Sequence, residues 1–266
     1  MSGLTPDAWA GYRRSLDEDG YLVVKEVVSS DRLAAFDEMV ADEFARINRD
    51  SVLFDGGGFY SGHLNCLPGT GARFAYDDIV DAGVVDFIRT VNPAWADRPR
   101  LMMNYNLPDS HAQHYHMDGV YLADFLICNI AVVDTDLSNG ALDVLPATNR
   151  RFYRFWQYAV QRKFRSTTRV PLSRGDIVIR RSTLWHRGMP NRSAKARPML
   201  AFTFGDTPTA NPDPFAGSTE AMEFYPNWYQ PTAIGRIRER ITVAAPITFS
   251  SYRFVRSLFS DKGYSS

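Results

Sequence analysis

The sequence predicts a mainly β protein with flanking helices, built around a double-sheet antiparallel barrel or jelly roll. Short strand-like runs follow one another between residues 100 and 206, and turn signals such as LSNGA, SRGD and MPNRS separate them. Short strands at such spacing are typical of jelly rolls. We therefore expect one domain with a helical part at 1–99, a jelly-roll core at 100–206 and a helical extension at 207–266.

The first hundred residues contain three helical patterns and one β-branched strand. Helices are predicted at 4–20, 29–48 and 77–91, and the strand at 21–28. Pro6 lies in the first turn of the first helix, Gly20 ends it, and Ser30 is the expected cap of the second. Residues 54–74 contain GGG and LPGTG, so they are predicted to form a loop.

The core region alternates apolar runs with turns. Strands are predicted within 101–107, 113–119, 125–134, 141–146, 167–173, 176–188 and 197–206. A more helical segment, RRFYRFWQYAVQRKF, interrupts this series from residue 150. The end of the chain, at 232–259, has the pattern of two short amphipathic helices.

Composition and charge exclude several classes of protein. The chain has 266 residues, 45% of them hydrophobic, and its formal net charge is zero, which argues against general nucleic-acid binding. No apolar run approaches a membrane span, the first residues lack a signal-peptide core, and only two cysteines are present. We therefore expect a cytoplasmic protein without a membrane span. The sequence does not indicate an oligomeric state.

The charges are unevenly distributed along the chain. Residues 1–100 hold 10 basic and 17 acidic side chains, whereas residues 101–266 hold 20 basic and 13 acidic ones. The second part is therefore the expected location of an anionic small molecule.

A candidate metal site lies in the stretch HAQHYHMDGVY. His116 and Asp118 form an H-x-D pair, and residues two apart on a strand point to the same face. His186 follows at the end of a later predicted strand. Two histidines and one carboxylate are the ligands of non-heme Fe(II) oxygenases, which leave coordination positions open for a co-substrate and dioxygen. A structural zinc site would instead use a closed set of four ligands, usually including thiolates.

Arg197 lies on the predicted strand after His186. A guanidinium can hold a carboxylate through two parallel hydrogen bonds, so Arg197 is the candidate anchor for the distal end of a 2-oxo acid bound at the metal. Arg192 is the competing candidate.

These motifs together resemble the phytanoyl-CoA dioxygenase family of Fe(II)/2-oxoglutarate dioxygenases. The resemblance rests on H-x-D at 116–118, SNGALDVLPATNR at 138–150 and GDIVIRRSTLWHRGMPNRSAKAR at 175–197, with a weaker match at DEDGYLVVKEVVS. It implies a double-stranded β-helix core of the jelly-roll, cupin-like kind, with Fe(II), 2-oxoglutarate and dioxygen as cofactor and co-substrates. By position, it implies that His116, Asp118 and His186 bind iron and that Arg197 binds 2-oxoglutarate.

One position departs from the family pattern. Many relatives have a glutamine that contacts 2-oxoglutarate two residues before the first ligand, and here that residue is His114. His114 and Asn104 are the further candidates for contact with the co-substrate, with a hydrogen bond inside the sheet as the alternative for each. Related halogenases replace the ligand carboxylate with a small residue, whereas this chain keeps Asp118, which favours hydroxylation.

Residues 150–169 hold seven basic side chains and no acidic one, interleaved with aromatic residues. One interpretation is a lid that holds an anionic substrate. The alternative is a helix with a solvated basic face and an apolar core face. The candidate substrate-binding residues are Arg150, Arg154, Trp156 and Arg162, together with His63 from the glycine-rich loop.

The sequence thus predicts a 2-oxoglutarate-dependent oxygenase that hydroxylates an unactivated C–H bond of a small molecule, which could be anionic, a sugar or a secondary metabolite. The same cofactors could also support desaturation, cyclisation or epimerisation, and the residues do not discriminate between these outcomes. A non-catalytic jelly-roll protein that binds a metal but not 2-oxoglutarate is the alternative from another class.

Overall fold

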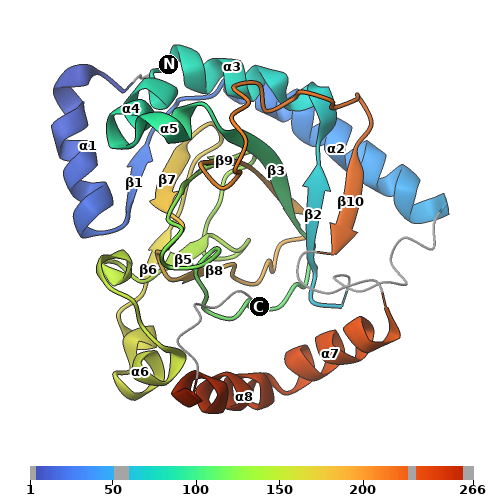
Figure 1. Cartoon of the computed structure of the whole chain (residues 1–266). Coiled ribbons are helices and arrows are strands. Elements are labelled where there is room, and N and C mark those ends of the chain that lie inside the picture. Colours follow the sequence, from blue (N-terminus) through green and yellow to red (C-terminus); the bar gives the residue numbers. More distant parts are fainter. Residues whose placement is uncertain (1–3, 51–59, 227–231, 260–266) are drawn as a thin grey trace.

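Two antiparallel sheets lie at the centre of the molecule, with helices around them (Figure 1). The structure is a computed structural model that describes residues 4–50, 60–226 and 232–259. The helices are α1 (Pro6–Glu18), α2 (Ser30–Asp50), α3 (Arg73–Asp81), α4 (Val84–Val91), α5 (Pro93–Ala96), α6 (Phe155–Val160), α7 (Ala233–Ala244) and α8 (Pro246–Phe259). The strands are β1 (Tyr21–Val24), β2 (His63–Leu67), β3 (Pro99–Asn106), β4 (Leu126–Ala131), β5 (Leu142–Val144), β6 (Thr168–Val170), β7 (Ile177–Arg181), β8 (His186–Arg187), β9 (Arg197–Phe204) and β10 (Glu223–Pro226).

The larger sheet has seven strands in the order β1-β7-β4-β9-β3-β2-β10, and the smaller sheet has three in the order β6-β5-β8. This arrangement confirms the predicted mainly β core with flanking helices. Strands β1 and β2 come from the first hundred residues and β10 from the C-terminal part, so all three parts of the chain contribute to one sheet.

The outer face of the large sheet packs against the N-terminal helices (Figure 1). Alternate residues of its strands, such as Met103 and Phe202, join side chains of α2 and α4, such as Phe36 and Phe87, in one apolar cluster. The cluster is fully buried, as expected where the alternating faces of a sheet are both covered.

The inner face of the large sheet turns toward the small sheet. Val178 and Met199 of the large sheet pack with Val144 and Val170 of the small sheet. Along β7, the side chains alternate, so Arg180 shares the inner face with Val178. The space between the sheets therefore receives polar as well as apolar side chains.

Several sequence predictions in the first hundred residues were wrong in detail. Strand β1 ends at Val24, because Glu26 has a left-handed φ of 54° and leaves the extended conformation. Helix α2 begins at Ser30, and the hydroxyl of Ser29 accepts a hydrogen bond from the Arg32 amide, so Ser29 takes the capping position expected of Ser30.

The predicted loop at 54–74 and helix at 77–91 also differ. Residues 51–59 lie outside the described residues, but His63–Leu67 form strand β2, which pairs with β3 and β10. The single predicted helix is divided into α3 and α4 by Gly83, whose φ of 75° breaks the helical conformation.

The later part of the chain follows the predicted runs with three exceptions, and the first is that Glu223–Pro226 forms strand β10 within the predicted helical extension. Residues 113–119 form no regular strand, and only an isolated bridge joins His116 to His186. The run at 176–188 divides into β7 and β8, which belong to different sheets. The two C-terminal amphipathic helices are present as α7 and α8, and α8 contacts α6 (Figure 1). No helix within the described residues is long and apolar enough to cross a membrane.

Candidate active site

The structure brings His116, Asp118 and His186 together between the two sheets. His116 and His186 exchange two main-chain hydrogen bonds of 2.9 and 2.8 Å, and the Asp118 amide donates to the carbonyl of Ser182 at 2.8 Å. One ligand atom from each of the three side chains lies within 4.8 Å of the others. An isolated bridge thus holds the two histidines next to each other.

Main-chain carbonyls fix how the two imidazoles are protonated. Nδ1 of His116 lies 2.8 Å from the carbonyl of His114, and Nδ1 of His186 lies 2.9 Å from that of Leu184. A carbonyl only accepts hydrogen bonds, so each Nδ1 carries the proton and each Nε2 keeps its lone pair. Both Nε2 atoms face Asp118, at 3.6 Å from His116 and 3.5 Å from His186.

A buried arginine accompanies the carboxylate. Nη1 of Arg180 lies 2.7 Å from Oδ2 of Asp118, and its Nε donates to Oδ1 of Asn129 at 3.1 Å. Burial by itself raises the pKa of Asp118, but Arg180 and the two imidazoles outweigh it and hold that pKa well below its usual range. Burial lowers the pKa of His116 and of His186, and Arg180 lowers that of His186 further. The site therefore presents two neutral imidazoles and one carboxylate.

Arg197, the first residue of β9, is buried with 5% of its surface exposed. Its Nη1 contacts Sδ of Met199 at 3.7 Å, and its Nε has no hydrogen-bond partner in the described part of the chain. Burial, with a smaller effect of Arg169, lowers the pKa of Arg197 to about 10. A buried guanidinium without a carboxylate partner is the feature expected of an anion site. Arg192, the competing candidate, is exposed.

Two other predicted residues lie on neighbouring strands. His63 of β2 is buried, its Nε2 lies 2.6 Å from the carbonyl of His111, and burial lowers its pKa to about 4. Arg197 and His116 both lower that pKa further, which places His63 near the two predicted binding groups. Asn104 of β3 donates from Nδ2 to Oδ1 of Asn65 at 3.0 Å. A sheet hydrogen bond was the alternative reading of Asn104, and its role toward the co-substrate stays a prediction.

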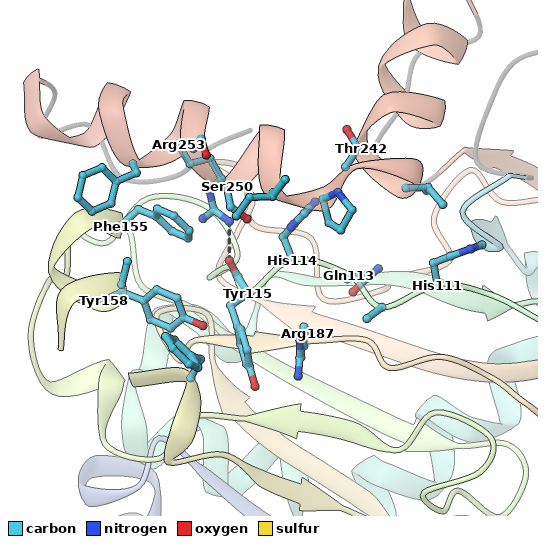
Figure 2. A pocket seen from close by; sticks show the side chains of 18 of the residues that line it. His111, Gln113, His114, Tyr115, Phe155, Tyr158, Arg187, Thr242, Ser250 and Arg253 are labelled. Atoms are coloured by element: carbon cyan, nitrogen blue, oxygen red, sulfur yellow. Dashed lines mark hydrogen bonds between the residues drawn. The ribbon is translucent and has the colours of Figure 1, made fainter. Parts of the chain in front are cut away.

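A cavity of about 940 Å³ lies beside these residues, and we call it the outer cavity (Figure 2). Its walls come from residues 111–115, α6, Arg187 of β8 and the two C-terminal helices. His63 and His114 both line it, and the His114 ring lies 4.6 Å from that of Phe249 on α8. The structure thus places His114 against α8, and its contact with 2-oxoglutarate stays a prediction.

The predicted substrate-binding residues of 150–169 do not line the outer cavity in the described part of the chain. Arg150 and Arg162 are exposed, and the Trp156 amide donates to the hydroxyl of Ser257. The side of α6 that faces the cavity carries aromatic residues instead. Phe155 and Tyr158 are buried, and Tyr158 stacks on Trp185 with 4.6 Å between the ring centroids. Phe155 and Tyr158 belong to an apolar cluster and also line the cavity, so both interpretations of the aromatic residues stay predictions. Arg154 is half-buried at the cap of α6.

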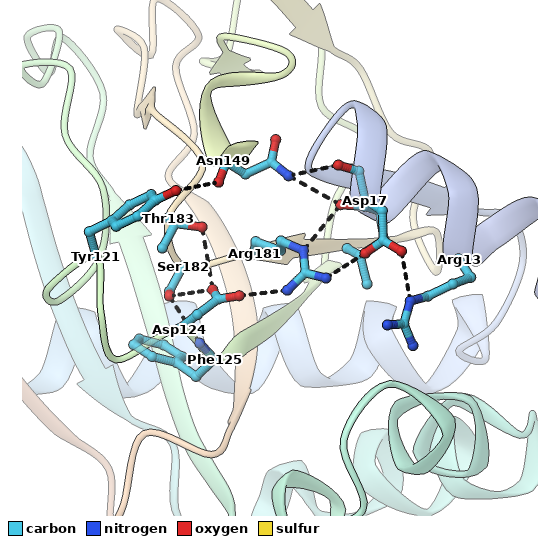
Figure 3. A network of polar contacts seen from close by, with 10 residues as sticks. Arg13, Asp17, Tyr121, Asp124, Phe125, Asn149, Arg181, Ser182 and Thr183 are labelled. Carbon is cyan, nitrogen blue, oxygen red and sulfur yellow. Dashed lines mark hydrogen bonds and ion pairs between the residues drawn. The ribbon is translucent and has the colours of Figure 1, made fainter. Parts of the chain in front are cut away.

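A polar network holds the loop after Asp118 in place (Figure 3). Arg181 forms ion pairs with Asp124 of that loop and with Asp17 of α1, both at 2.5 Å. The Ser182 hydroxyl donates to Asp124 and accepts from the Phe125 amide. The network ties the loop to the turn between β7 and β8, and so keeps Asp118 opposite His186.

Three basic residues near the site were missed by the sequence analysis, namely Arg180, Arg187 and Arg253. Alternation along β7 could have identified Arg180, because Ile177 and Ile179 must face the apolar helices and residue 180 then faces inward. Arg187 and Arg253 had no comparable signal. They line the same cavity because α8 packs against the residues before Asp118, where Arg253 donates to the carbonyl of Tyr115 at 2.8 Å.

Comparison with known proteins adds a family match. The family model described as Phytanoyl-CoA dioxygenase (PhyH) matches residues 16–199, which is more than half of the chain. The match contains the candidate ligands and Arg197.

Solved structures share the fold. The carbocyclase SnoK from nogalamycin biosynthesis superposes with a TM-score of 0.57 at 16% identity, covering 79% of this chain and 87% of that chain. HygX from Streptomyces hygroscopicus, solved with nickel, 2-oxoglutarate and hygromycin B, gives 0.56 at 18%, covering 78% and 90%. EctD from S. alaskensis, solved with bound Fe, gives 0.57 at 16%, covering 77% and 80%. At these identities, the likeness establishes the fold alone.

Proposed function

The chain belongs to the phytanoyl-CoA dioxygenase family of 2-oxoglutarate-dependent oxygenases, and on this premise we propose that it hydroxylates an unactivated C–H bond of a small molecule. We propose His116, Asp118 and His186 as the Fe(II) ligands and Arg197 as the residue that holds the distal carboxylate of 2-oxoglutarate. The observation that carries the proposal is the pairing of a two-histidine, one-carboxylate cluster with a buried arginine that has no carboxylate partner among the described residues.

The residues present fit ferrous iron. Two neutral imidazoles with their Nε2 lone pairs directed at a common carboxylate form the donor set that suits non-heme Fe(II). Asp118 stays ionised, and no cysteine belongs to the cluster, which disfavours a closed zinc site. Ferrous iron with 2-oxoglutarate supplies the activation of dioxygen and the oxidation of the C–H bond.

The chain's own residues supply orientation and charge. The carbonyls of His114 and Leu184 keep each ligand imidazole in one tautomer, and Arg180 holds the carboxylate of Asp118 toward them. Arg197 would set the direction in which a dicarboxylate enters. The aromatic residues around Trp185 form an apolar wall on the side of the site that faces α6.

The oxidative outcome depends on where the substrate lies. Asp118 occupies the position that a halide would need, which supports oxidation without halogenation. Cyclisation and epimerisation remain second candidates, because the structural neighbours include a carbocyclase and an epimerase from nogalamycin biosynthesis. The mass of the product separates the three classes, since it gains an oxygen, loses two hydrogens or stays unchanged.

The test is an anaerobic titration. Fe(II) followed by 2-oxoglutarate should produce the weak visible absorption band of the iron chelate, and Asp118→Ala should abolish it. Arg154→Ala is the matched control, because Arg154 lies outside the cluster, and it should leave the band unchanged. If metal binds to the wild-type protein and no band forms, the oxygenase assignment is wrong and the chain is a metal-binding jelly-roll protein.

A further inference from the structure

The outer cavity is of a size for a small organic molecule. Its volume of about 940 Å³ lies near the upper end of the range of ~300–1,000 Å³ found for ligand pockets. Tyr115 and Arg187 line it, and each is the chain neighbour of a proposed iron ligand, His116 or His186. The cavity therefore adjoins the proposed iron site.

One wall of the cavity is aromatic. Phe155, Tyr158 and Phe164 line it on the side of α6 (Figure 2). Tyr158 is held in orientation by its stacking on Trp185, at an interplanar angle of 19°. Phe164 is 46% exposed, so its ring can stack on a flat apolar part of a ligand at little entropic cost.

Two cations and no carboxylate line the cavity within the part of the chain that the structure describes. The cations are Arg187 and Arg253. The described lining therefore carries positive and no negative side chains, and Asp143 lies behind it as the partner of Arg187.

Arg187 has the geometry of an anion-binding group. Its Nε donates to Oδ2 of the buried Asp143 at 2.9 Å, and its guanidinium lies 4.2 Å from the centroid of the Tyr115 ring. These two contacts hold the planar group still. Its terminal nitrogens form no hydrogen bond with the described residues, and the side chain is 28% exposed, so they can donate to a ligand.

Arg253 brings a second positive charge from α8. It is 6% exposed, its Nη1 donates to the neutral carbonyl of Tyr115, and its guanidinium lies 4.3 Å from the centroid of the Phe155 ring. Since Tyr115 also stacks under Arg187, the two arginines approach the same residue from different elements. Each is thus positioned by an aromatic ring and a hydrogen bond.

We propose that the outer cavity is the substrate chamber and that it selects a flat cyclic or aromatic molecule bearing one anionic group, which Arg187 and Arg253 recognise. The proposal rests on the proposed function for the identity of the reaction, but the ligand class follows from the cavity itself. The expected contacts with the anion are therefore Arg187 and Arg253, in place of Arg150, Arg154 and Arg162 of the helical segment.

The test uses two probes of the same shape and different charge. 2-Naphthoate and 2-naphthamide are titrated into the full chain, and binding is followed by fluorescence. We expect the carboxylate to bind at least about tenfold more tightly, because it gains charge-assisted hydrogen bonds that the amide lacks. Arg187→Gln and Arg253→Gln should each reduce this preference, whereas Arg154→Gln, which lies outside the cavity, should not.

Two controls keep the result interpretable. Thermal unfolding of each variant identifies one that has lost its fold, and the comparison of the two probes on the wild-type protein does not depend on any variant. Equal affinity for both probes, or tighter binding of the amide, would overturn the proposal.

Arg197→Met separates this inference from the proposed function. If the Arg197→Met variant no longer prefers naphthoate to naphthamide, while the Arg187→Gln variant still does, the anion binds at Arg197 and the inference is wrong. If 2-oxoglutarate fails to bind the wild-type protein while the preference still depends on Arg187, the proposed function is wrong and the ligand class stands.

Discussion

Arg197 offers the sharpest test of the site, because its removal should change stability and binding in opposite directions. Burial lowers the pKa of its guanidinium from 12.5 to about 10. At pH 7, the group is protonated in both the folded and the unfolded chain. The lowered pKa therefore means that burial of the charged guanidinium destabilises the folded state and does not affect the unfolded chain. At about 1.4 kcal/mol per pKa unit, the cost is about 3 kcal/mol.

We expect Arg197→Met to remove that cost in the metal-free protein. The methionine would lie beside Met199 in an apolar setting, so the free energy of unfolding should rise by about 1–3 kcal/mol. Binding of 2-oxoglutarate should weaken, since two charge-assisted hydrogen bonds of about 1.5–3 kcal/mol each are lost. The dissociation constant should rise by between about a hundredfold and ten-thousandfold.

Two measurements check these expectations. Urea unfolding of the metal-free protein gives the stability, and anaerobic titration of 2-oxoglutarate into the Fe(II) protein gives the affinity. Arg192→Met is the matched control, because Arg192 is an exposed arginine five residues earlier, and it should change neither quantity. A variant at Arg197 that is less stable than the wild type and binds 2-oxoglutarate equally well would refute the reasoning.

Three further predictions concern the ligands, pH and the backbone. Asp118→Asn should weaken Fe(II) binding at least about a hundredfold in a metal titration, because it removes the anionic ligand. Burial lowers the pKa of His63 from 6.5 to about 4, so the folded state favours the neutral ring. The stability that this preference contributes is complete above pH 6.5 and is lost as the pH falls toward 4. Between pH 7 and pH 5, the free energy of unfolding of the metal-free protein should therefore fall by about 2 kcal/mol more than that of the His63→Gln variant, as measured by urea unfolding. Gly140→Ala should cost about 1–3 kcal/mol in the same assay, because φ is +92° there and the new Cβ would lie 2.6 Å from the carbonyl oxygen of Met189. Gly217→Ala, also at positive φ but with open space around it, should cost less.

Strands that coincide with long apolar runs were predictable from the sequence, and a short strand held by distant pairing was not. β4 and β9 lie within the predicted runs, and β3 begins two residues before its run. β2 is five residues long and follows a glycine-rich stretch, so no apolar run marks it. Its register depends on β3, where Asn65 lies opposite Asn104. Such pairing is invisible in a local window of sequence.

The candidate ligands were predictable for a different reason. H-x-D places an imidazole and a carboxylate near each other through local geometry, and His186 lies just beyond an apolar strand run. The local geometry differs from the expectation, since residues 113–119 form no regular strand and an isolated bridge joins His116 to His186. The residue types thus pointed to the site although the local structure was wrong.

The sequence by itself indicated the fold class, the family, and the candidate side chains for binding a metal and a dicarboxylate, because these depend on short-range spacing and on residue chemistry. Only the tertiary structure decided which arginines surround the site. The segment at 150–169 is rich in basic residues, yet the cavity is lined by Arg187 and Arg253, which are 66 positions apart in the chain. The physical reason is that residue type sets the charge of a side chain, whereas the burial of that side chain depends on the elements packed around it. That packing depends on α8 folding against the barrel, which no local pattern in the sequence records.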